Sequence, residues 1–89
     1  MAISLANVDE ALREEDIEGF ITLGAPGDEY SHEAQEITAA LASLRVDQLT
    51  EANIVAILAL VWAKAFNRSP QEIKQRIPAF QHVANRLLS

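Results

Sequence analysis

The sequence predicts an all-α fold, a compact bundle of about five helices. Apolar residues recur at three- and four-residue spacing along most of the chain, and no segment alternates apolar and polar residues as a half-buried strand would. Residues able to cap helices stand in front of these segments. The 89 residues, of which 49% are apolar, can form one modest core, so residues 1–89 are predicted to be a single domain.

The first two helices are predicted at residues 8–14 and 17–23. Asn7 and Asp16 stand in front of them, and their side-chain oxygens can accept hydrogen bonds from the first free amides of a helix. Gly19 lies inside the second helix and costs about 1 kcal/mol relative to alanine. We therefore expect this short helix to depend on the packing of its apolar side chains.

The sequence GAPGDEY, residues 24–30, predicts a tight turn followed by a helix. Proline at position 26 presets φ and glycine at position 27 accepts a positive φ, which is the pattern of a type II turn. Ser31 is expected to cap a third helix over residues 32–44. The apolar stripe of that helix consists of Ala34, Ile37, Leu41 and Leu44.

The fourth helix is predicted from Thr50, its cap, to about Phe66. Leu49 and Ile54 have the spacing of a hydrophobic staple. Because this helix is apolar on nearly all sides, it is expected to be the buried centre of the fold, with Trp62 shielded from water. A stripe of small residues along one side would let another helix approach closely. It consists of Ala52, Ala56, Ala59 and Ala63.

The last helix is predicted over residues 70–88. Residues 69–72, SPQE, place a capping serine, a proline in the first turn and a glutamate at the capping-box position. Pro78 interrupts the hydrogen-bond ladder on the side opposite the apolar stripe, so one kinked helix is expected rather than two. The stripe consists of Ile73, Ile77, Phe80, Ala84 and Leu87.

The composition narrows the possible compartments and sites. The chain has no cysteine, which rules out disulfides and thiolate metal sites. The longest apolar run, residues 54–63, is shorter than the roughly 18 residues that a membrane-spanning helix requires. The N-terminal residues have no basic region followed by a long apolar run, so no secretory signal is expected. We expect a cytoplasmic protein that does not contact membranes.

Acidic residues are concentrated in the first part of the chain. Residues 1–36 contain ten acids and one base, a sum of −9, whereas residues 37–89 contain three acids and six bases, a sum of +3. Two interpretations stay open: differently solvated faces, or an acidic surface that attracts a protein partner with a basic surface. Nucleic acid is not expected as a ligand, because phosphate binding requires clustered lysine and arginine.

No catalytic constellation or cofactor motif is present. One cluster could hold a metal, because Asp28, Glu29, His32, Glu33 and Glu36 lie within nine residues and include a Glu-x-x-His spacing. Di-metal bundles require a second such motif, which no other segment supplies. Acids that complement the dipole of a helix explain the cluster without a metal. We therefore predict no metal and no cofactor, and keep a metal-dependent enzyme as an alternative.

The stretch from residue 16 to residue 37 resembles a family of small bacterial all-α domains of uncharacterised function with a Gly-Ala-Pro-x-Asp-Glu-Tyr motif. The matching residues are Gly24, Ala25, Pro26, Asp28, Glu29 and Tyr30. The chain departs from the family pattern at Gly27, where an acid is common, and at residues 31–32, where Asp-Pro is common. The resemblance implies a compact helical domain and no known activity.

These observations favour a non-enzymatic protein-interaction module with an acidic N-terminal surface, in an adaptor or immunity-like role. Its candidate binding residues are Asp28, Glu29, Tyr30, Glu14, Glu15 and Glu18. Tyr30 has two interpretations, a half-buried anchor of the turn or part of an exposed recognition patch. The first alternative is a self-associating structural domain whose homodimer contact is the alanine stripe together with Leu60. The second is the metal-dependent enzyme built on His32 and its neighbouring carboxylates.

Overall fold

The computed structural model describes residues 3–25 and 29–89, and these residues form helices joined by turns, without a strand. The elements are α1 (Leu5–Glu15), α2 (Ser31–Ala42), the short 3-10 helix η1 (Val46–Gln48), α3 (Glu51–Ala65) and α4 (Pro70–Leu88). The predicted all-α class is confirmed. The number of helices is corrected from about five to four.

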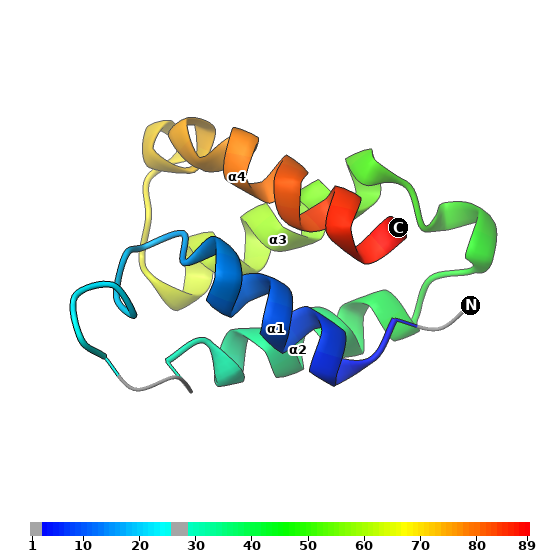
Figure 1. Cartoon of the computed structure of the whole chain (residues 1–89). Coiled ribbons are helices and arrows are strands. Elements are labelled where there is room, and N and C mark those ends of the chain that lie inside the picture. Colours follow the sequence, from blue (N-terminus) through cyan, green and yellow to red (C-terminus); the bar gives the residue numbers. More distant parts are fainter. Residues whose placement is uncertain (1–2, 26–28) are drawn as a thin grey trace.

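Successive helices run in alternating directions and close into a ring around one core (Figure 1). α1 packs against α2 and α4, and α3 packs against the same two helices. The shortest dimension of the molecule is 19 Å, about two helix diameters. Each helix therefore keeps one side on the surface.

The helices begin where side chains can satisfy the first free amides. Ser69 and Glu72 form the predicted capping box in front of α4, and the side chain of Thr50 caps α3 as expected. α1 begins earlier than predicted because Ser4 supplies its cap by accepting a hydrogen bond from the amide of Asn7 at 3.1 Å. Asn7 thus lies inside the first turn.

The core draws large side chains from all four helices. Trp62 has no exposed surface, which confirms that it is shielded from water. Its ring packs at centroid distances of 5.7 Å from Tyr30, 4.9 Å from Phe66 and 5.9 Å from Phe80.

α4 is a single helix as predicted and continues through Pro78, which is exposed.

The expected second helix, residues 17–23, is instead a series of turns. Asp16 ends α1 in the left-handed conformation, with φ of 47°, and Gly19 has φ of 74°. The side chain of a helix cap accepts hydrogen bonds from the amides two or three residues further along the chain. The carboxylate of Asp16 instead accepts from the amides of Ile21 and Thr22. The turn predicted at positions 26 and 27 lies outside the described residues.

The expected central position of α3 is also wrong. Only Ile54, Leu58 and Trp62 of this helix are buried, and they form a single stripe. The opposite side faces away from the core, and Leu60 is 73% exposed there. α3 is one of four helices around the core rather than a helix enclosed by the others.

Candidate functional site

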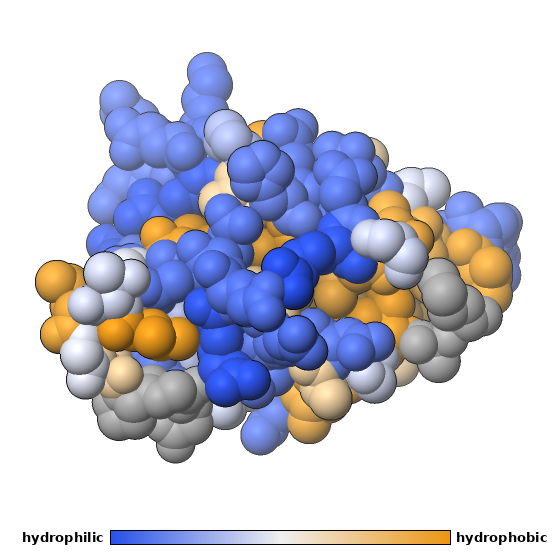
Figure 2. Space-filling model, viewed as in Figure 1, coloured by the Kyte–Doolittle hydropathy of each residue, from blue (hydrophilic) through white to orange (hydrophobic). Residues whose placement is uncertain are grey.

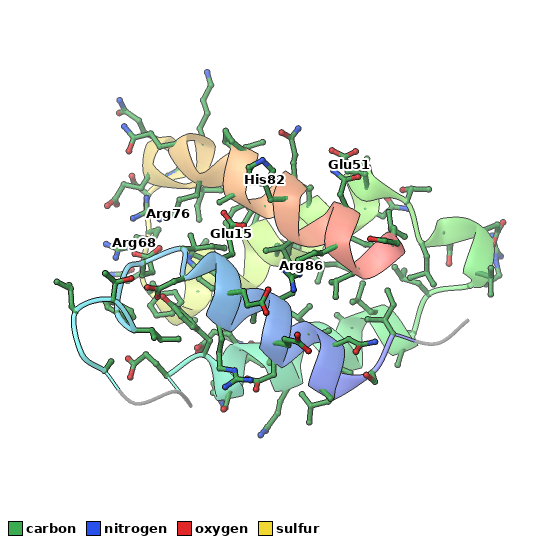
Figure 3. The ribbon with its side chains drawn as sticks, in the orientation of Figure 1. Glu15, Glu51, Arg68, Arg76, His82 and Arg86 are labelled. Atoms are coloured by element: carbon green, nitrogen blue, oxygen red, sulfur yellow. The ribbon has the colours of Figure 1, made fainter. Side chains whose placement is uncertain are left out.

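A buried carboxylate fastens the segment between α1 and α2 to the helices. The Glu18 side chain is 2% exposed. Its Oε2 accepts hydrogen bonds from Trp62 Nε1 at 2.7 Å and from Arg76 Nε at 2.6 Å. Its Oε1 accepts from Arg76 Nη2 at 3.1 Å and from Arg68 Nη2 at 2.5 Å. Figure 3 shows Arg68 and Arg76 close together at the end of the bundle where α4 begins. Two-point pairing of a guanidinium with a carboxylate is among the strongest polar contacts in proteins.

Asp16 and Tyr30 extend this network. The hydroxyl of Tyr30 donates to Asp16 Oδ1 at 2.7 Å and accepts from the amide of Glu18 at 3.1 Å. Burial opposes ionisation of Asp16, but hydrogen bonds from Tyr30 and Thr22 outweigh it and lower the pKa of Asp16 to about 2. Burial likewise opposes ionisation of Glu18, and the hydrogen bonds from its three partners hold its pKa below the usual value. Both groups are therefore carboxylates at neutral pH.

Two of the six candidate binding residues thus belong to the interior. Tyr30 is fully buried and Glu18 nearly so, which makes them anchors of the fold and removes them from any contact surface. Glu29 is exposed, as a recognition patch would require. Asp28 lies outside the described residues. Among the described residues of the predicted Asp-Glu-Tyr patch, Glu29 lies on the surface.

Glu14 and Glu15, the other two candidates, lie where α1 faces α4. Glu14 forms an ion pair with Arg86, and Glu15 Oε2 lies 3.6 Å from His82 Nδ1 (Figure 3). The face that α1 and α4 present is mostly hydrophilic (Figure 2). Because α4 supplies bases opposite the acids of α1, the field of this face is weaker than the local sum of −9 suggests.

The predicted cluster around His32 contains one close polar contact. His32 Nε2 lies 2.9 Å from Glu36 Oε1 on the surface of α2. Glu33 is 7% exposed, and burial raises the pKa of its carboxyl group. Within residues 3–25 and 29–89, no three histidine or acidic side chains are grouped so that they could hold a metal ion.

The outward side of α3 is mostly apolar and partly exposed, with Asn53 and Lys64 on the same side as Leu60. All of the 15 residues of this helix are apolar except Glu51, Asn53 and Lys64. Leu60 is 73% exposed. The predicted alanine stripe lies on this side, where Ala52 and Ala56 are exposed and Ala59 and Ala63 are partly exposed. We name this side, made of Leu60 and the four alanines, the α3 face. The α3 face combines apolar character with exposure over three turns of one helix.

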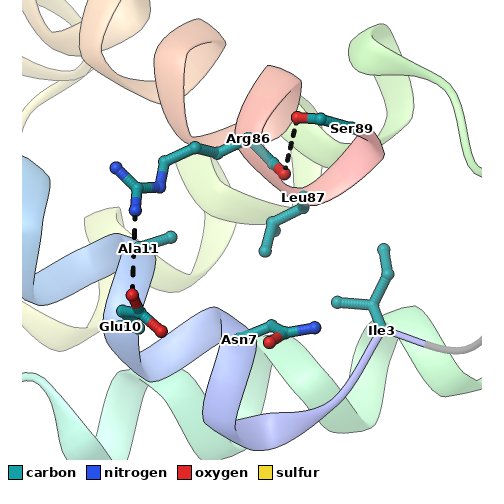
Figure 4. A pocket seen from close by; sticks show the side chains of 7 residues that line it. All are labelled: Ile3, Asn7, Glu10, Ala11, Arg86, Leu87 and Ser89. Atoms are coloured by element: carbon teal, nitrogen blue, oxygen red, sulfur yellow. Dashed lines mark hydrogen bonds and ion pairs between the residues drawn. The ribbon is translucent and has the colours of Figure 1, made fainter.

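A small pocket of about 270 Å³ lies between the start of α1 and the end of α4 (Figure 4). Ile3 and Leu87 provide apolar walls, and Asn7, Glu10 and Arg86 provide polar ones. Glu10 Oε1 and Arg86 Nη2 are 4.0 Å apart, so the charged groups at this pocket face each other. The pocket offers a ligand few groups that are not already engaged.

Reasoning from the sequence missed the partners of Glu18. Arg68, Arg76 and Trp62 are 50, 58 and 44 residues away along the chain. The sequence contains one local signal for Glu18 itself. It lies between Ile17 and Phe20, whose apolar side chains are expected to be buried. A buried acid in such a setting requires a cationic partner, but the sequence does not say which one.

None of the helices in the described ranges has the length and apolar character needed to cross a membrane. Tyr30, one of the residues on which the expected resemblance to a family of small bacterial domains was based, has a structural role here. Neither a family model, nor a curated protein, nor a solved structure matches this chain.

Proposed function

We propose that this chain is a non-enzymatic protein-interaction module that associates with a second copy of itself through the α3 face. The observation that carries the proposal is the exposure of that face, with Leu60 at 73% and two alanines of the stripe on the surface. Apolar surface gains about 25 cal/mol for each Å² removed from water. An exposed, largely apolar face therefore favours a contact that covers it.

A second copy suits the α3 face because one surface can serve both partners. In a two-fold symmetric contact the same patch is used twice, so it must complement itself. The alanine spacing reads the same in both directions along the helix, so antiparallel helices would place Ala52 opposite Ala63 and Ala56 opposite Ala59. Small residues allow helix axes to approach to about 8 Å, at the short end of the usual range.

A second candidate is a protein partner with a basic surface, in an adaptor or immunity-like role. The net charge of −6 and the exposed Glu29 favour it. Against it, Glu14 and Glu15 lie beside Arg86 and His82, and Glu18 is buried. Such a partner would bind less tightly as salt is added, whereas association through the α3 face would change little.

Sedimentation equilibrium over a range of protein concentrations tests the proposal. The wild-type chain should form dimers, and Leu60→Glu should shift the population to monomers because it buries an unpaired charge. Leu23→Glu is the matched control, since Leu23 is 84% exposed but does not lie on α3. A wild-type chain that stays monomeric at millimolar concentration would contradict self-association. Salt-sensitive binding to a basic protein would then support the second candidate.

A further inference from the structure

Residues 16–25, which we name the strap, are held together by their own hydrogen bonds. The carbonyls of Asp16, Gly19, Phe20 and Ile21 accept from amides of the strap, at Gly19, Leu23, Ala25 and Gly24. The carboxylate of Asp16 accepts from the amides of Ile21 and Thr22. In the described chain, only the amides of Asp16 and Glu18 bond outside the strap, to Leu12 of α1 and to the Tyr30 hydroxyl. The strap would thus keep most of its backbone hydrogen bonds if it moved as a unit.

Side chains provide most of the attachment of the strap to the helices. The carboxylate of Glu18 contributes four of these contacts, to α3, to α4 and to the residues between them. Phe20 packs at centroid distances of 6.1 Å from Tyr30 and 5.8 Å from Phe66. Leu23, in the second half of the strap, is 84% exposed and adds little. Glu18 and Phe20 thus make the polar and aromatic contacts that hold the strap, and Ile17 and Ile21 also pack against the core.

The start of the strap has the backbone of a hinge. Asp16 has φ of 47°, a conformation that costs free energy for a residue with a side chain. Residues at the end of an element are common points of rotation between rigid parts. Opening by rotation at Asp16 would release its hydrogen bond to Tyr30 and the contacts of Glu18, and it would leave the α-helices intact.

We propose that the strap opens as a unit about Asp16 while the four helices stay folded, and that Glu18 is the latch that holds it closed. Opening uncovers the rings of Trp62 and Phe66 at the C-terminal end of α3. It also frees the guanidinium groups of Arg68 and Arg76. That opening would enlarge the contact surface on α3 is a consequence that rests on the proposed function. The opening itself does not depend on that function.

Native-state hydrogen exchange of the wild-type chain, measured by NMR in low concentrations of urea, tests the opening. Opening releases two N–H groups: the amide of Glu18, which is bonded to the Tyr30 hydroxyl, and the indole N–H of Trp62, which is bonded to Glu18 Oε2. These released groups should exchange faster than the backbone amides of Leu58 and Trp62 in α3. Their exchange should also depend less on urea, because a local opening exposes less surface than unfolding does. Protein concentrations at which the chain is monomeric separate this test from self-association.

Glu18→Gln tests the latch. The substitution removes the negative charge and places an amide N–H donor among the N–H donors of Trp62, Arg68 and Arg76. It should speed exchange of the released groups roughly 10- to 100-fold relative to the backbone amides of α3, as expected from the loss of hydrogen bonds to a charged group. Glu15→Gln is the control and should change neither region, since its partner His82 is 72% exposed.

Three results would overturn the proposal: the same rate and urea dependence for the released groups and the backbone amides of α3, no protection of the released groups, or equal acceleration of both sets by Glu18→Gln. The wild-type urea series decides the question of local opening even if the Glu18 variant does not fold.

Discussion

Replacing Leu58 and Leu60 separately with alanine distinguishes the two sides of α3. The residues are two positions apart in one helix, and the chemical change is the same at both. Leu58 has no exposed surface, whereas Leu60 is 73% exposed. Because leucine and alanine both favour helix, the intrinsic propensity of α3 changes little in either variant. The difference between the variants therefore measures burial.

The expected magnitudes follow from that difference in exposure. Leu58→Ala removes three buried carbon groups at about 0.8 kcal/mol each and leaves a cavity, so the free energy of unfolding should fall by about 2.5–5 kcal/mol. Leu60→Ala should change it by no more than about 0.5 kcal/mol at low protein concentration. For a domain of this size, a loss of 3 kcal/mol lowers Tm by roughly 12–25 °C.

Urea unfolding followed by the fluorescence of Trp62, the single tryptophan, provides the assay. Its shielded ring should emit at short wavelength in the native state and shift to the red on unfolding. Measurements below micromolar concentration keep any dimer from contributing to the stability of the Leu60 variant. Equal losses in the two variants, or a larger loss in Leu60→Ala, would refute the assignment of the buried and outward sides of α3.

Three further predictions concern the titratable and polar groups of the interior. Tyr30→Phe should lower the free energy of unfolding by about 1–3 kcal/mol, because the carboxylate of Asp16 and the amide of Glu18 lose a partner; an unchanged urea midpoint would argue against this network. The folded pKa values of Asp16 and Glu18 are below their unfolded ones, so the stability they provide is present above about pH 4 and is lost as the pH falls toward 2; a urea midpoint that is constant from pH 5 to pH 2.5 would contradict this. The folded pKa of Glu33 is instead raised, which destabilises the native state as the pH rises through it. Glu33→Gln should therefore raise Tm at pH 7 and leave it nearly unchanged at pH 3, and the reverse pattern would count against burial of that carboxylate.

Features decided by neighbouring residues could be predicted from the sequence. Ser69 and Glu72 are three residues apart and cap α4 whatever packs around them, and Thr50 likewise fixes the start of α3. The strap was misassigned because its local signals allow two outcomes. An aspartate at position 16 can cap a helix that follows it or end one that precedes it, and the left-handed residues at 16 and 19 favour the second.

Features decided by contacts between distant residues could not be predicted. The sequence shows that Glu18 lies among apolar residues, but its partners come from three places between 44 and 58 residues away. In the same way, the periodicity of α3 shows that most of its sides are apolar. Which side meets α2 and α4 and which carries Leu60 to the surface depends on how all four helices pack.

Site-directed cross-linking tests the central claim, association through the α3 face, most directly. The chain has no cysteine, so a single introduced cysteine reports on its own position. A disulfide requires Cβ atoms about 3.5–4.5 Å apart, which only a contact at that residue provides. A mixture of Ala56→Cys and Ala59→Cys chains, whose cysteines face each other in the antiparallel contact, should form a linked dimer rapidly on mild oxidation, and adding Leu60→Glu to both should prevent it. Gln81→Cys, exposed on α4, should react slowly. Equal, slow cross-linking of this mixture and of Gln81→Cys would contradict the claim.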